Sequence, residues 1–174
     1  MEETTTSSPT AMSIGLKFGA ILGLASIVQT LIGFAIGSNP LSNNWVNTVI
    51  AIAVSVAVIV FAHKAFKDGG DGYMGYGQGL GIAMVTSLVS LVITGLFTYI
   101  YINFIDTNAF EEIWEKAAAD MEAKGQSQEA IDMGMSWGRK LFWVFYALGG
   151  AFGGLIVGLI VTIFTQKKAP EQTF

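Results

Sequence analysis

The stretch WVNTVIAIAVSVAVIVFAH, residues 45–63, contains no acidic residue, no lysine and no arginine. Its many valines and isoleucines favour a β-strand by propensity. Its length favours a helix, because about 20 mostly apolar residues in a helix cross the roughly 30 Å hydrocarbon core of a bilayer. A lone strand would leave its backbone groups without hydrogen bonds in lipid, whereas a helix pairs its own. We therefore expect a transmembrane helix here.

Three other apolar segments are long enough to cross a bilayer in the same way; they are residues 13–37, 80–105 and 141–165. The composition agrees, since 52% of the 174 residues are hydrophobic and only 13% are charged. A typical soluble domain has about 25% charged residues. The sequence therefore predicts an all-α integral membrane protein with four transmembrane helices in one domain, residues 13–165.

Residues 1–12 are low in apolar content and rich in Thr and Ser, so we expect a disordered segment before the first span. A cleaved signal peptide is the alternative, because Ala35 and Gly37 form a small-x-small site. Glu2 and Glu3 argue against cleavage, since a signal peptide begins with positive charge. The apolar segment is also longer than the usual signal core of about 7 to 15 residues.

Lysines near the helix ends predict which side of the membrane each end faces. If the chain crosses four times, the lysines that fall on one side are Lys17, Lys64, Lys67, Lys167 and Lys168. The link of residues 106–140 falls on the other side and carries eight acidic and four basic residues. We expect both termini, with the tail of residues 166–174, in the cytoplasm and the link outside it. Arg139 and Lys140 run against this assignment.

Six glycines lie between Gly69 and Gly79, in the stretch GGDGYMGYGQG. A phosphate-binding loop would need the sequence GK[ST] and a preceding strand. Neither is present in this stretch, which follows a predicted membrane helix. We interpret the glycines as a flexible cytoplasmic turn between the second and third spans.

Two stretches of the chain carry a family resemblance. HKAFKDGGDGYMGYGQGLGIAM (residues 63–84), which leads into YIYINFIDTNAFEEIWEKAAADME (residues 99–122), resembles the bacterial membrane-protein family catalogued as domain of unknown function 4199. The resemblance spans most of residues 13–165, and this chain adds glycines at Gly75, Gly79 and Gly81. It implies a four-helix protein of the bacterial inner membrane and brings no reaction with it.

Small residues four apart on a membrane helix allow two helix backbones to approach closely. Two spans show this spacing, at Gly15, Gly19 and Gly23 in the first and at Gly150, Gly154 and Gly158 in the fourth. We expect these faces to pack on other helices. The sequence leaves open whether the partner helix belongs to the same chain or to a second copy.

The four spans contain no Asp or Glu, and an ionisable group in mid-membrane is the usual mark of an ion or proton pathway. Lys17 lies about one turn from the predicted cytoplasmic end, where it can reach the headgroups. The candidate polar intramembrane residues are Gln29 and Asn47. We expect these amides to bond neighbouring helices; the alternative is that they line a path for an uncharged substrate.

The external link has a helical pattern. Asn108 is a candidate cap with Glu111 at the third helical position. The apolar residues that recur on one face include Phe110, Ile113, Trp114 and Met121. Gly125 is expected to end this helix and Ser127 to start a second one that runs into the fourth span. The link is thus an amphipathic helical hairpin, and its stripe can pack on the chain or membrane or dock a partner. Its acids can alternatively bind a divalent cation.

Chemical motifs are absent from the sequence. Without cysteine the chain has no thiol nucleophile, and its single histidine, His63, cannot supply a His-pair metal site. We expect no enzymatic activity, metal, cofactor or nucleic-acid partner. The leading expectation is a structural or accessory subunit that contacts membrane lipids and a membrane protein partner, or a second copy, through the external helix and the glycine faces. The alternative is a small oligomeric channel or carrier for an uncharged or lipid-like substrate.

Overall fold

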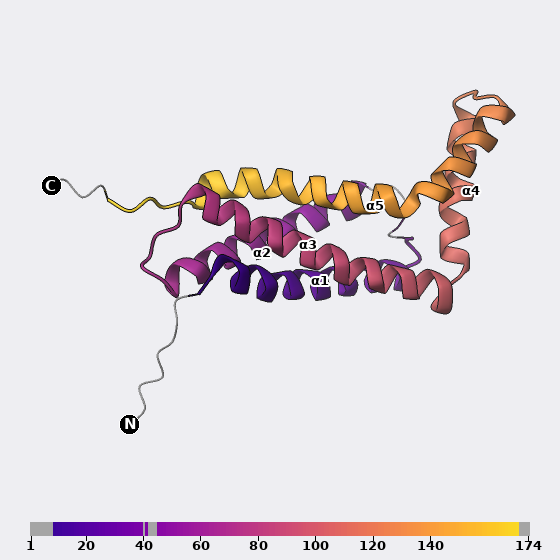
Figure 1. The fold of residues 1–174 in the computed structure, drawn as a ribbon. Coiled ribbons are helices and arrows are strands. Elements are labelled where there is room, and N and C mark those ends of the chain that lie inside the picture. The colour runs from indigo at the N-terminus through magenta and orange to yellow at the C-terminus, as the bar shows by residue number, and fades with distance from the viewer. Residues whose placement is uncertain (1–8, 40, 42–44, 171–174) are drawn as a thin grey trace.

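The computed structural model describes residues 9–39, 41 and 45–170 (Figure 1). The helices are α1 Ala11–Ala35, α2 Trp45–Asp68, α3 Tyr76–Ile100, the π-helical turn η1 Tyr101–Ile105, α4 Asn108–Ala123 and α5 Gln128–Thr165. In this part of the chain the only extended pairing is a single bridge between Met74 and Lys167. The described protein is therefore all-helical.

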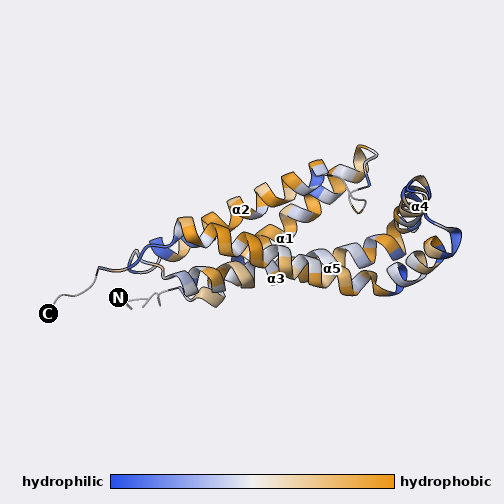
Figure 2. Cartoon of the chain, turned by 90° about the horizontal axis from the view of Figure 1, so that it is seen from above, coloured by the Kyte–Doolittle hydropathy of each residue, from blue (hydrophilic) through white to orange (hydrophobic). Residues whose placement is uncertain are grey.

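Four of these helices are long and apolar enough to cross a membrane: α1, α2, α3 with η1, and α5. Figure 2 shows apolar residues along all four. Many large side chains on them face outward, including Leu24, Phe61, Val92, Leu148 and Phe164. Outward-facing apolar side chains are what a lipid-facing surface requires. The four predicted spans are confirmed as apolar helices, and the helix bounds differ in detail.

The first helix starts within the segment expected to be disordered. The Thr10 hydroxyl accepts a hydrogen bond from the Ser13 amide (3.0 Å), and the Ser13 hydroxyl accepts one from the Thr10 amide (3.1 Å). This reciprocal capping satisfies two backbone donors and starts α1 at Ala11. α1 thus begins two residues before the predicted span, and residues 1–8 lie outside the described part. Gly37, with a φ of 74°, follows the end of α1.

Part of the glycine stretch is helical rather than a turn. Gly75 has an extended conformation, and its amide donates to the Gln78 side chain (2.8 Å). This cap starts α3 at Tyr76, so the later glycines of the stretch belong to the first turns of a helix. The connection between α2 and α3 is shorter than the sequence suggested, because α2 also continues to Asp68.

α3 is the central helix of the packing. α1 lies along its full length, from Gly15 beside Val85 to Phe34 stacked on Tyr101 with ring centres 4.2 Å apart. α5 packs on another side of α3. α2 contacts α1, and it meets α5 through Ile59 beside Val161. Figure 2 shows α2 and α5 diverging toward the end of the molecule that carries α4, here called the hairpin end.

The opposite end, where α1 begins and α5 ends, is held together by a buried histidine. We call this the terminal end. His63 has no exposed surface; its Nε2 lies 2.8 Å from the Gly79 carbonyl oxygen of α3, and its Nδ1 lies 2.7 Å from Thr165 Oγ1 of α5. Lys67 Nζ donates to the Thr165 carbonyl (2.8 Å). One side chain therefore joins α2 to both α3 and α5.

The hairpin consists of α4 and the first turns of α5, and Figure 1 shows it crossing the direction of the long helices. α5 is one continuous helix, so the second link helix runs directly into the fourth span, as expected. Ser127 caps it, as predicted, by accepting from the Ala130 amide (3.4 Å). Gly125, with a φ of 74°, follows α4 as predicted.

The predicted cap at Asn108 is wrong. Asn108 is the first helical residue, and the Asp106 carboxylate accepts from its amide (3.1 Å) and from the Ala109 amide (3.2 Å). A carboxylate suits this position because it meets the positive end of the helix dipole.

Candidate functional site: a cleft between α2 and α5

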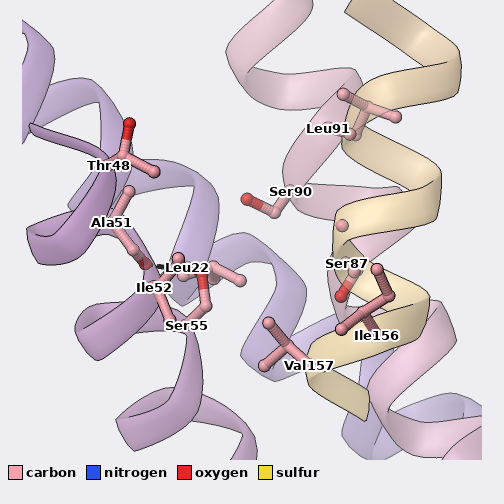
Figure 3. A pocket seen from close by; sticks show the side chains of 13 residues that line it. Leu22, Thr48, Ala51, Ile52, Ser55, Ser87, Ser90, Leu91, Ile156 and Val157 are labelled. Carbon is pink, nitrogen blue, oxygen red and sulfur yellow. Dashed lines mark hydrogen bonds between the residues drawn. The ribbon is translucent and has the colours of Figure 1, made fainter. Parts of the chain in front are cut away.

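A cleft of about 480 Å³ lies between α2 and α5, partly open at the surface of the molecule (Figure 3). Its walls come from α2 and α5, and its floor comes from α3 with Leu22 of α1. The residues that line the two walls are Thr48, Ala51, Ile52 and Ser55 on α2, and Gly150, Gly153, Gly154, Ile156 and Val157 on α5. Its volume falls within the usual range for small-molecule sites, about 300 to 1,000 Å³.

The cleft follows from the way the four helices pack. The His63 contacts bring α2 against α5 at the terminal end, while the two helices separate toward the hairpin end. α1 and α3 pack tightly along their length and close the floor. The cleft therefore lies between α2 and α5 where the two helices separate.

Glycines on α5 allow this wall of the cleft to pack closely on α3. A Cβ atom added at Gly150 would lie 2.4 Å from Leu91 Cδ1, and one at Gly154 would lie 2.5 Å from Ser87 Cβ. At Gly158 it would lie 2.9 Å from Ala83 Cβ. These three predicted glycines therefore touch α3 of the same chain. Gly153, which lines the cleft, has nothing within 4 Å of its Cβ position.

The glycine face of α1 also contacts α3. Added Cβ atoms would lie 2.6 Å from Val85 at Gly15, 2.6 Å from Val89 at Gly19 and 2.9 Å from Ile93 at Gly23. α1 and α3 approach this closely because the glycines have no side chain. The structure thus places both glycine faces at helix contacts within one chain.

The polar groups of the cleft are hydroxyls on α2 and α3. Thr48 and Ser55 belong to α2, and Ser87 and Ser90 belong to α3. Ser55 donates to the Ala51 carbonyl oxygen (2.8 Å). Ser90 is only 7% exposed, and none of the side-chain hydrogen bonds within residues 9–39, 41 and 45–170 involves its hydroxyl. The fully buried side-chain atoms without a partner in this part of the chain are others: Asn47 Nδ2, Trp114 Nε1 and Thr162 Oγ1. Figure 3 shows the Ser90 hydroxyl pointing across the cleft toward α2.

Gln29 and Asn47 do not line the cleft. The Gln29 side chain donates to the Asn47 carbonyl oxygen (3.1 Å), so the structure brings the two predicted polar residues together and joins α1 to α2. Asn47 Nδ2 is buried and has no hydrogen-bond partner among the described residues. The contact lies near the hairpin end, at the start of α2.

The apolar stripe of α4 packs on α5. The ring centre of Phe110 lies 5.1 Å from that of Phe142, and the Trp114 ring covers Gly138, whose added Cβ would lie 2.6 Å from it. Met121 covers Gly134, and Ile113 on the same stripe is half-buried. Most of the stripe is therefore used inside the hairpin.

The polar face of the hairpin holds one ion pair. Arg139 donates two hydrogen bonds to the Glu111 carboxylate, of 2.7 and 2.6 Å. These bonds hold the pKa of Glu111 below its ordinary value. In the part of the chain that the structure describes, no three His, Asp or Glu side chains come together as a metal site.

Comparison with known proteins gives a family and no function. The family model described as protein of unknown function (DUF4199) matches residues 17–167. The chain belongs to this family. The resemblance seen in the sequence is thereby confirmed. No curated protein and no solved structure matches.

The DUF4199 match covers every residue that lines the cleft, from Leu22 to Val157, and the whole hairpin. Sequence reasoning missed several of the residues that matter in this DUF4199 chain. Gly134 and Gly138 had a readable signal, since they are four apart and face the stripe of α4. Ser90 had little signal, because a single serine in an apolar helix usually bonds its own backbone.

Proposed function

We propose that this chain is a multi-pass protein of the bacterial inner membrane that binds an uncharged, lipid-like molecule in the cleft between α2 and α5. Ser90 carries the proposal. Buried polar groups in proteins almost always have a hydrogen-bond partner, and at membrane depth water does not supply one. Ser90 is 7% exposed as a residue, and its hydroxyl points into the cleft and has no hydrogen-bond partner among the described residues. A molecule held in the cleft would supply it.

The packing favours this function over the accessory role expected first. That role relied on the glycine faces and the α4 stripe as free contact surfaces. The glycine faces contact α3, and the stripe contacts α5. An accessory subunit would have to use other surfaces, whereas a binding protein would use the cleft that the packing creates.

The proposed orientation puts the terminal end in the cytoplasm and the hairpin outside. Lys64, Lys67 and Lys167 lie at the terminal end, in agreement with an excess of positive charge on the cytoplasmic side. Of the two residues that ran against this assignment, Arg139 is paired with Glu111, and Lys140 still runs against it. The hairpin therefore presents mainly acidic side chains.

Single cysteines test the orientation cleanly because the chain has none of its own. We expect a cysteine at Glu112, an exposed position on α4, to react with a membrane-impermeant thiol reagent applied to intact cells. A cysteine at Asp71, in the connection between α2 and α3, should react only after the cells are permeabilised. The opposite labelling pattern would invert the topology.

Two glycines of α5 provide a matched test of the cleft. Gly153→Leu should fill the cleft, because Gly153 lines it and has open space at its Cβ position. Gly149→Leu is the control, since Gly149 also has open space there but lies outside the cleft lining. We expect native mass spectrometry of protein in lipid nanodiscs to show a retained small molecule in the wild type and in Gly149→Leu, and its loss in Gly153→Leu.

Two results would count against this function. If both leucine variants kept the molecule, it would be bound elsewhere. If the wild type carried no small molecule and instead retained a stoichiometric partner protein, the accessory role would be correct.

A further inference from the structure

The cleft constrains the chemistry of the molecule it binds. All of its lining side chains are apolar, glycine or hydroxyl-bearing, and none carries a charge. A phosphate or carboxylate placed there would lose its hydration without a cationic partner, at a cost of several kcal/mol. The bound group must therefore be uncharged.

The hydroxyls of the cleft differ in whether they already donate a hydrogen bond within the protein. The Ser55 hydroxyl already donates a hydrogen bond to the Ala51 carbonyl oxygen (2.8 Å). Ser90 and Ser87, three residues apart on α3, make no side-chain hydrogen bond among the described residues, so both protons are available. Residues three apart lie on the same face of a helix. The cleft floor thus presents two neighbouring donors to whatever fills the space.

We infer that the cleft binds an uncharged lipid whose head group bears a carbonyl oxygen, and that Ser90, with Ser87 beside it, donates to that oxygen. This inference rests on the proposed function and adds the ligand class to it. Two membrane sources share the chemistry: isoprenoid quinones, with ring carbonyls, and acylglycerols, with ester carbonyls. Their apolar chains would lie along Leu22, Ile52 and Val157 of the cleft.

Three probes separate the possibilities: a benzoquinone with a single isoprene chain, dioctanoylglycerol, and a plain alkane without any acceptor. Binding to protein in nanodiscs is measured by titration with native mass spectrometry. We expect the quinone, the acylglycerol or both to bind more tightly than the alkane. Preference between the first two names the source, and either preference supports the carbonyl chemistry.

Alanine variants of the serines assign the donor. Ser90→Ala should weaken binding of the carbonyl probe about five- to tenfold, the loss expected for one hydrogen bond. Alkane binding should not change. Thr30→Val is the control, because Thr30 lies outside the cleft lining and its hydroxyl already donates to the Ser26 carbonyl oxygen (2.9 Å); it should leave the affinity for the quinone within about twofold.

The outcomes keep the two proposals apart. If Gly153→Leu abolishes binding but Ser90→Ala does not weaken it, the cleft is a binding site and the carbonyl inference is wrong. The same holds if the alkane binds as tightly as the carbonyl probes. If no probe binds the wild type, the proposed function itself fails. A serine variant that unfolds is recognised by loss of alkane binding. Ser90→Cys, which replaces the hydroxyl by a much weaker donor of similar size, then takes the place of Ser90→Ala.

Discussion

Gly19→Leu is expected to separate α1 from α3 and to cause the largest loss of stability among single substitutions in the long helices. A Cβ atom at this position would lie 2.6 Å from Val89 Cβ and 2.9 Å from the Thr86 carbonyl oxygen. The second atom belongs to the backbone of α3, so no side-chain rotation can relieve the clash. Overpacking of this kind costs about 1–3 kcal/mol of stability and occasionally more. A leucine side chain is larger than the Cβ atom considered above, so we expect a loss at the upper end of this range.

The measurement is the unfolding midpoint in a mild detergent titrated with a denaturing one. Gly81→Leu is the control, because Gly81 lies on α3 with nothing within 4 Å of its Cβ position. We expect Gly81→Leu to keep the wild-type midpoint and Gly19→Leu to lower it clearly. Equal midpoints for the two variants would show that α1 and α3 do not pack as described.

His63→Leu is expected to open the terminal end. The substitution places an apolar side chain in the fully buried position and removes both ring nitrogens, which contact the Gly79 carbonyl oxygen and Thr165 Oγ1. Two hydrogen bonds are worth about 1–3 kcal/mol together. We expect a loss of about that size in unfolding free energy.

Hydrogen exchange makes the His63 test specific to the terminal end. The Lys167 amide, which donates to the Met74 carbonyl oxygen (2.9 Å), should exchange faster in His63→Leu, because the end of α5 loses one of its contacts with α2 and keeps only those of Lys67 and Ile59. Lys64→Leu changes the adjacent exposed residue and should leave this amide protected. Unchanged protection in His63→Leu would contradict the role given to the histidine.

The sequence predicts the four long helices well because an apolar segment of about 20 residues has few alternatives in a membrane. It also predicts the hairpin, since the recurrence of Phe110, Trp114 and Met121 is a local pattern. Helix starts are less predictable. Asp106, rather than Asn108, supplies the cap of α4, and both are suitable residue types two positions apart.

The cleft and the buried histidine could not be predicted, for a different reason. Ser90 and Ser55 face one space only because α2 and α3 adopt a particular rotation about their axes. His63 meets Thr165 across 102 positions of sequence. Apolar membrane helices have hydrophobic residues all round, so periodicity does not reveal which face is turned inward. Glycine spacing showed which helices pack closely, but not that α3 is the shared partner.

The central place of α3 has a consequence for biosynthesis. α1 and α3 carry complementary surfaces, and both have been synthesised before α4 and α5 leave the ribosome. The tight pair can therefore form early and serve as the platform on which the last helix docks. The cleft acquires its second wall, and His63 its Thr165 partner, only when α5 arrives. Completion of the cleft is thus coupled to completion of the chain, so a partly made protein lacks one of its two walls.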